Sequence, residues 1–207
     1  DSFTYSDGGF GGTDPANSDV AGTRNTGDGD AANGALQVYI DGQNGLASAN
    51  ISGAWSRTVN LADNANSVQL GLSYRHWHDS SNDAGEDSRV YVEVDGVRYG
   101  VGANDYISQA LGSGGTTDTG WVQIVLDLGS LVAGNHTITM GIFQTAENGS
   151  TEDSYVRFDD ISLSYSLPSG LVTTLSGQDG LDTLYGGAGI DYFVFEAASA
   201  FNNIDKV

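Results

Sequence analysis

Apolar and polar residues alternate along most of residues 1–166, and this period of two constrains the fold more than any other feature. In the longest run, Val68, Leu70, Leu72, Tyr74 and His76 share one phase. Similar runs occupy residues 36–40, 90–94, 97–101, 122–128, 136–142 and 156–165. Successive side chains of a strand point to opposite faces, so this pattern predicts half-buried strands, whereas helical periodicity is nearly absent. About nine or ten strands in one domain favour an all-β, antiparallel jelly-roll sandwich.

Two local signals refine this expectation. Asp95 and Gly96 separate two alternating runs, as in a tight hairpin. In the last run, Val156 and Phe158 keep one phase, but the apolar residues shift to the other phase after Asp159 and Asp160. Such a slip predicts either a β-bulge or a carboxylate turned toward the interior, which would then need a cation or several donors.

The chain is strongly acidic, with 27 Asp and Glu against 7 Lys and Arg and a formal net charge of -20. This field repels nucleic acids and anionic membrane surfaces, so neither is an expected partner, whereas cations are attracted. No run of apolar residues is long enough to span a membrane, so no membrane insertion is expected. The chain also contains no cysteine. A disulfide-free domain outside the cell needs another cross-link, and bound Ca²⁺ can provide it.

Two loops repeat the same acidic pattern. Glu86-Asp87-Ser88 precedes one predicted strand, and Glu152-Asp153-Ser154 precedes another. Both follow loops rich in Asp, Asn, Ser and Gly, the first of which contains Asp79 and Asp83. These residues supply the hard oxygen ligands and tight turns of calcium sites. We therefore expect the loops to lie on one rim and to share one or more Ca²⁺ ions; a weaker candidate is the turn at residues 28–33.

A nine-residue repeat follows the predicted sandwich. Residues 177–185 and 186–194 place glycines, an aspartate and an apolar residue in the same register. This is the G-G-x-G-x-D-x-U-x pattern of calcium-binding β-rolls. Residues 175–207 thus resemble the RTX family of secreted bacterial proteins, and residues 167–174 become the linker. The resemblance implies a short β-roll segment in which Asp179, Asp182 and Asp191 bind Ca²⁺. Each β-roll turn uses two nonapeptides, so about one turn is expected.

Catalytic motifs are absent from the sequence, which has no G-x-S-x-G elbow, P-loop or H-E-x-x-H helix. His76 and His78 have the spacing that places both side chains on one face of a strand. They could form half of a zinc site, but a hydrogen-bonded histidine at the rim is the favoured interpretation. We therefore expect a binding module rather than an enzyme.

Residues 156–163 resemble the closing strand of jelly-roll carbohydrate-binding modules. In those modules a structural Ca²⁺ often joins the first and last strands, which implies Asp159 or Asp160, together with Asp1 or a nearby acid, as ligands. More widely, the sandwich resembles domains that precede RTX repeats in large bacterial surface adhesins. The segments that carry this resemblance are residues 1–5, 52–56, 86–88, 94–96, 119–121, 133–137 and 158–160.

The adhesin resemblance implies a monomeric module of a larger, extracellular protein on the bacterial cell surface, acting in adhesion and biofilm formation. The expected function is calcium-dependent binding of a peptide through its free carboxylate end. Two alternatives stay open, which are a lectin-like carbohydrate-binding module and a structural spacer rigidified by calcium. Trp77, Tyr99 and Tyr106 are the aromatic candidates for contacting a ligand, and Trp77 is expected on the outer side of its strand.

Overall fold

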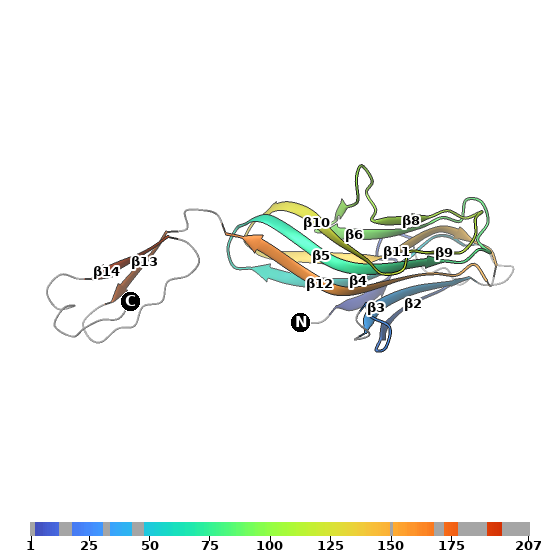
Figure 1. Ribbon diagram of the computed structural model, residues 1–207, viewed down its shortest axis with the longest axis horizontal. Helices are drawn as coiled ribbons and strands as arrows, with labels where there is room; N and C mark the ends of the chain where they lie inside the picture. Colours follow the sequence, from blue (N-terminus) through green and yellow to red (C-terminus); the bar gives the residue numbers. More distant parts are fainter. Residues whose placement is uncertain are drawn as a thin grey trace.

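The computed structural model describes residues 3–12, 18–30, 34–42, 48–149, 151–167, 172–177 and 190–195. Every regular element in these residues is a β-strand. Twelve strands form two antiparallel six-stranded sheets that pack face to face, and Figure 1 shows the resulting elongated sandwich. The all-β sandwich predicted from the period-two pattern is therefore confirmed.

The first sheet has the order β1-β4-β11-β6-β7, with β8 also paired to β6. Its strands are β1 (Thr4–Asp7), β4 (Ser48–Leu61), β11 (Gly134–Glu147), β6 (Ser88–Val94), β7 (Val97–Tyr99) and β8 (Ser108–Ala110). The second sheet has the order β10-β5-β12-β3-β2, with β9 also paired to β5. Its strands are β10 (Val122–Leu131), β5 (Ala65–His78), β12 (Ser154–Ser166), β3 (Ala35–Gly42), β2 (Ser18–Asn25) and β9 (Thr117–Asp118).

The strand order is that of a jelly roll. The central strands of the second sheet run β3-β12-β5-β10, and those of the first sheet run β4-β11-β6-β7. Consecutive long strands therefore alternate between the two sheets, and β12 returns to lie beside β3. This return brings the end of the sandwich sequence next to its beginning, and it places β12 between β3 and β5.

The alternating residues fill the space between the sheets as predicted. Val68 and Leu70 of β5 are fully buried, as are Met140 and Ile142 of β11 and Phe158 of β12. Removing this apolar surface from water is the main force that holds the sheets together. The same face of β5 continues to His76 and His78, which are 0% and 1% exposed. His76 is hydrogen-bonded, as the favoured interpretation requires, and it lies buried near the end of β5.

Both local signals are confirmed. Asp95 and Gly96 have φ values of 53° and 78°, the left-handed backbone that joins β6 tightly to β7. Pairing of β12 with β5 shifts between Asp159 and Ser162, and Asp160 has a φ of 50°. The phase slip is therefore a β-bulge. The alternative, a carboxylate turned inward, is wrong for Asp160, because its side chain is exposed.

A separate two-stranded sheet contains β13 (Val172–Gly177) and β14 (Ile190–Phe195). The strands are parallel, and Val172 pairs with Ile190, so partners are separated by 18 residues. That separation equals two nonapeptides of the repeat. The predicted linker, residues 167–174, thus overlaps the start of β13.

Candidate functional site

Three carboxylates from the two acidic loops meet at one end of the sandwich. Asp83 and Glu86 come from the loop between β5 and β6, and Glu152 comes from the loop between β11 and β12. One oxygen atom of each lies within 4.8 Å of the others. We call these three residues the acidic rim. The expected meeting of the two loops is therefore present in the fold, because β5, β12, β11 and β6 all begin or end at this edge.

Hydrogen bonds hold the acidic rim in place. Asn148 donates from its side chain to Glu86 Oε1 over 2.6 Å, and its backbone N–H donates to Glu152 Oε2. The Gly149 N–H also donates to Glu152 Oε2, over 2.7 Å. The Asp83 N–H donates to Glu86 Oε2, which closes a turn within the first loop. Asn148 thus connects both glutamates, whose carboxylates accept bonds from backbone N–H groups and from the Asn148 side chain.

The acidic rim concentrates negative charge away from water. Glu86 and Glu152 are each only 5% exposed, whereas Asp83 is exposed. Burial raises the pKa of Glu86, and the nearby charge of Glu152 adds to the rise, although the bonds from Asp83 and Asn148 oppose it. None of the ion pairs formed within the described ranges reaches these carboxylates. Hard oxygen atoms that converge without a cationic side chain match the ligand preference of Ca²⁺.

The other predicted calcium ligands of the loops lie around the acidic rim. Asp79 accepts a bond from the Ser81 N–H, and the backbone N–H of Asp79 donates to the carbonyl oxygen of Asp153 over 2.9 Å. Asp87 accepts from the Gly112 N–H over 3.0 Å. The carboxylates of Asp79 and Asp87 therefore accept hydrogen bonds from loop backbone, and neither belongs to the three-residue cluster.

The remaining predicted ligands lie elsewhere. Asp159 accepts from the backbone N–H groups of Asp30 and Asp160, over 3.0 and 2.8 Å. Asp30 in turn accepts from Ser73, so the turn at residues 28–30 is fastened onto the second sheet. Asp179 and Asp182 lie outside the described residues, as does the side chain of Asp191, whose backbone pairs with Thr173.

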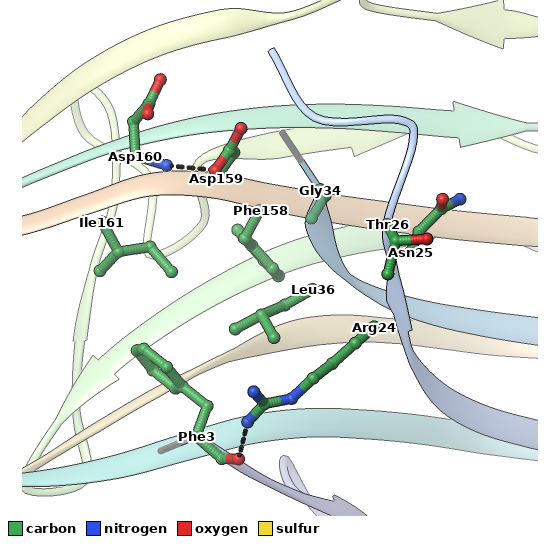
Figure 2. A pocket seen from close by; sticks show the side chains of 11 residues that line it. Phe3, Arg24, Asn25, Thr26, Gly34, Leu36, Phe158, Asp159, Asp160 and Ile161 are labelled. Atoms are coloured by element: carbon green, nitrogen blue, oxygen red, sulfur yellow. Dashed lines mark hydrogen bonds between the residues drawn. The ribbon is translucent and has the colours of Figure 1, made fainter. Parts of the chain in front are cut away.

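A cleft of about 480 Å³ opens beside the bulge. Figure 2 shows its apolar floor, formed by Leu36, Phe158 and Ile161, with the guanidinium of Arg24 on one side and Asp159 and Asp160 on another. Arg24 donates to the carbonyl oxygen of Phe3 over 2.9 Å, which joins the first sheet to the second at this edge.

The outer face of the second sheet carries a row of aromatic residues. Tyr155 of β12 lies directly between Tyr39 of β3 and Trp77 of β5 in the strand register. Directly opposite residues share one face of a sheet, so all three point outward. The rings of Trp77 and Tyr155 stack with centroids 5.3 Å apart and an interplanar angle of 11°. All three residues are partly exposed, as expected for Trp77 from its phase.

Polar residues flank this aromatic row. Two positions along the strands, Arg157 lies between Gln37 and Arg75 on the same face. Arg157 lies 4.6 Å from the centre of the Tyr155 ring and donates to Gln37 Oε1 over 2.7 Å. Arg75 donates two bonds to Asp118 of β9. We call these seven residues the recognition face: Gln37, Tyr39, Arg75, Trp77, Asp118, Tyr155 and Arg157.

A turn and a pair of loops border the recognition face at its two ends along the strands. On one side the turn at residues 28–30 crosses the sheet, where Asp28 contacts Arg157 and Asp30 accepts from Ser73 and Gln123. On the other side lie the loops of the acidic rim, which start one residue after His78 and end one residue before Ser154. The recognition face therefore lies between this turn and the loops of the acidic rim on the outer face of the second sheet.

Aromatic residues on the outer face of the first sheet are packed against one another instead. Phe10, in the segment after β1, packs on Tyr91 with ring centroids 5.4 Å apart, and Tyr91 is 3% exposed. Tyr106 and Phe143 pack against this cluster. Tyr99 packs at the edge of the main core. Tyr99 and Tyr106 thus belong to the first sheet or its loop, and they do not form one surface with Trp77.

The two core histidines form a neutral polar network. His76 contacts the hydroxyls of Ser108 and Ser88 over 2.9 and 2.8 Å, and His78 contacts those of Ser154 and Ser88. Burial lowers the pKa of His76 to about 3. Both side chains do share one face, but serine hydroxyls surround them, and the clusters of three or more metal-binding side chains among the described residues do not include them.

Sequence reasoning missed Tyr39, Tyr155, Arg75 and Arg157. Their strands showed the correct alternation, but only the pairing of β3 with β12, and of β12 with β5, places them side by side. Strands β3 and β12 are more than a hundred residues apart in the chain, so no local pattern indicated that they lie side by side.

Among the described residues, none lies in a helix long and apolar enough to cross a membrane.

No protein-family model matches the chain, and no curated protein matches it. Solved structures with a similar fold include a carbohydrate-binding module studied for mannan recognition, with 14% identity and a TM-score of 0.43, covering 77% of this chain and 86% of that one. A carbohydrate-binding module of the β-sandwich superfamily has 13% identity and a TM-score of 0.40, and the match covers 78% of this chain but only 56% of the other.

An adhesin domain of Lys-gingipain from Porphyromonas gingivalis W83 is also similar. It has 14% identity and a TM-score of 0.37, and the match covers 80% of this chain and 99% of the adhesin domain. These three proteins are binding modules or adhesin domains with a β-sandwich fold. All the TM-scores lie below 0.5, so the similarity adds nothing to the geometry of the recognition face or the acidic rim.

Proposed function

We propose that this chain is a non-catalytic glycan-binding module of a secreted or surface protein, and that Ca²⁺ bound at the acidic rim stabilises it. The observation that carries the proposal is the partly exposed row of Tyr39, Tyr155 and Trp77, flanked by arginine, glutamine and aspartate side chains. It lies on the outer face of the second sheet, whereas on the first sheet Phe10 packs over Tyr91.

The recognition face supplies the two kinds of contact that a sugar needs. A pyranose ring has apolar C–H surfaces, which pack against aromatic side chains. Its rim carries hydroxyl groups that both donate and accept hydrogen bonds, and Arg75, Arg157, Gln37 and Asp118 offer donors and acceptors at fixed positions. A partly exposed aromatic row with polar neighbours suits a glycan better than it suits a compact apolar ligand.

Calcium at the acidic rim would join two loops that otherwise repel each other. Asp83, Glu86 and Glu152 are the residues that would hold the ion, and their converging oxygen atoms fit its chemistry. The ion would neutralise buried charge at the edge where β5 ends and β12 begins. Because Trp77 and Tyr155 lie close to that edge, the loops also support the recognition face.

The wider context is a bacterial adhesin with RTX repeats. Support comes from the parallel pairing of β13 with β14 at a separation of 18 residues, which is the spacing of one β-roll turn. Such a protein would use the module to attach a cell to a glycan-bearing surface. Binding of a peptide through its free carboxylate end stays a prediction, since no described contact favours it over a glycan.

The test is a screen of the 207-residue chain on a glycan array in Ca²⁺, followed by calorimetry with the best glycan and with short peptides bearing free or amidated C-termini. Trp77→Ala and Tyr155→Ala should each weaken glycan binding by about 2 kcal/mol, roughly 30-fold. Tyr165→Ala, on the same strand and 48% exposed, is the matched control and should bind normally. Glycan binding unaffected by Trp77→Ala and Tyr155→Ala, or binding of peptides alone, would refute the proposal.

A further inference from the structure

We propose that the recognition face selects a neutral, hydroxyl-rich glycan and rejects acidic glycans that carry carboxylate or sulfate groups. This inference rests on the proposed glycan-binding function and adds the chemical class of the ligand. The observation behind it is that both arginines of the recognition face form ion pairs with carboxylates of the same chain.

Arg75 is paired in a bidentate geometry. Its Nε donates to Asp118 Oδ1 over 2.9 Å, and its Nη2 donates to Asp118 Oδ2 over 2.6 Å. The Gly120 N–H donates to the same Oδ1 over 3.0 Å and fixes the carboxylate. These contacts lower the pKa of Asp118 to about 2, the bond from Arg75 being the main cause. At neutral pH the pair therefore carries no net charge, and a ligand carboxylate would have to displace a well-held one.

Arg157 lies directly beside Arg75 in the strand register and is compensated in the same way by another carboxylate. One Nη atom contacts the carboxylate of Asp28, and its Nε donates to Gln37 over 2.7 Å. Its guanidinium also packs on the Tyr155 ring. The second arginine of the recognition face is thus also paired within the protein, because the turn at residues 28–30 brings a carboxylate to it.

The surrounding charges make the recognition face less favourable still for an anion. Asp153 hydrogen-bonds to Tyr39 and, with Asp41 and Asp79, places negative charge beside the aromatic row. The whole chain has a formal net charge of -20. An acidic polysaccharide would therefore approach against the field and find no uncompensated cation among the described residues of the recognition face.

Paired charges are nevertheless good partners for hydroxyl groups. A carboxylate that accepts from an arginine keeps lone pairs for another donor, and the guanidinium keeps further N–H groups. Adjacent sugar hydroxyls each donate and accept, so they can bridge such a pair without changing its charge. Two neighbouring Arg–Asp pairs beside an aromatic row thus match a neutral sugar chain.

The experiment compares neutral polysaccharides (mannan, galactan and a β-glucan) with acidic ones (polygalacturonate, alginate and a sulfated galactan) by affinity electrophoresis and calorimetry at low and physiological salt. The wild-type chain should bind at least one neutral polysaccharide and none of the acidic ones. Asp28→Asn with Asp118→Asn frees both arginines. This variant should weaken neutral binding and gain acidic binding by about fivefold per released arginine at low salt.

Asp105→Asn combined with Glu93→Gln is the matched control, because both carboxylates pair with Arg98 on the first sheet and their loss changes the net charge equally. This control should keep the wild-type selectivity, and melting curves establish that each variant is folded. Tighter wild-type binding of an acidic than of a neutral polysaccharide, weakened by Trp77→Ala, would overturn the neutral selectivity but retain glycan binding. No binding of either class would overturn the glycan-binding function itself, and the selectivity with it.

Discussion

Replacing Glu152 by Gln removes one charge from the acidic rim while it keeps the shape of the side chain. Glu152 suits this change because its Oε2 accepts both N–H bonds, from Asn148 and Gly149. A glutamine oxygen can occupy that position and accept the same bonds. The variant therefore separates the charge of the residue from its structural hydrogen bonds.

The expected effect has opposite signs with and without calcium. Oxygen atoms of the acidic rim lie within 4.8 Å of one another, where two unit charges repel by about 3.5 kcal/mol at an effective dielectric constant of about 20. The raised pKa of Glu86 relieves part of this repulsion, because protonation removes one of the charges. In EDTA, Glu152→Gln should thus raise the stability of the fold. In Ca²⁺ it should remove a ligand and lower the stability.

The assay is thermal unfolding of both proteins in EDTA and in Ca²⁺. Calcium at about 100 times its Kd stabilises the wild type by roughly 2.7 kcal/mol, which for a sandwich of this size raises the Tm by about 5–10 °C. Glu152→Gln should lose more than half of this rise and should melt above the wild type in EDTA. The control is Glu93→Gln, which removes a glutamate paired with Arg98.

Glu93→Gln should keep the full calcium response. The reasoning fails if calcium raises the Tm of Glu152→Gln as much as that of the wild type, or if the variant melts below the wild type in EDTA. The first result would place the ion elsewhere. The second would mean that the glutamates of the acidic rim do not repel each other in the folded domain.

Three further predictions test other parts of the sandwich. Gly112→Ala places a methyl group 1.9 Å from the carbonyl oxygen of Asp83, so it should lower the stability by about 1–3 kcal/mol and weaken calcium binding. In the control Gly115→Ala, the methyl group meets no atom within 4 Å, so neither stability nor calcium binding should change. Equal calcium titrations of the two variants would contradict this prediction. His76 has a pKa of about 3 against 6.5 unfolded, so its contribution to stability is present above pH 6.5 and is lost as the pH falls. His76→Gln should therefore flatten urea-derived stability between pH 6.5 and 4, and an unchanged slope would refute a buried neutral histidine. The bond to its carboxylate partner raises the pKa of His136, so that contribution is present below pH 6.5 and is lost as the pH rises through the higher, folded-state pKa; NMR titration of His136 checks this, and a pKa at or below 6.5 would refute it.

The local patterns of the sequence carried much information about the strands. Period-two alternation indicated which faces of β5, β10, β11 and β12 are buried, because burial on one face requires apolar residues at every second position. Asp95 and Gly96 indicated a tight turn, and the phase slip at Asp159 indicated a bulge, since each depends only on neighbouring residues. The repeated Glu-Asp-Ser motif also indicated that Glu86 and Glu152 belong together.

Pairings between distant strands decided the rest. A strand pattern does not say which strand lies next to it, so the row of Tyr39, Tyr155 and Trp77 exists only because β12 inserts between β3 and β5. The same holds for the pairing of charges, because Asp28 of a turn and Asp118 of β9 reach Arg157 and Arg75 from distant parts of the chain. By itself the sequence determined the strands, their buried faces and the acidic loops, because these follow from neighbouring residues. Only the tertiary structure decided which side chains share a face and which charges are compensated, because both depend on long-range packing.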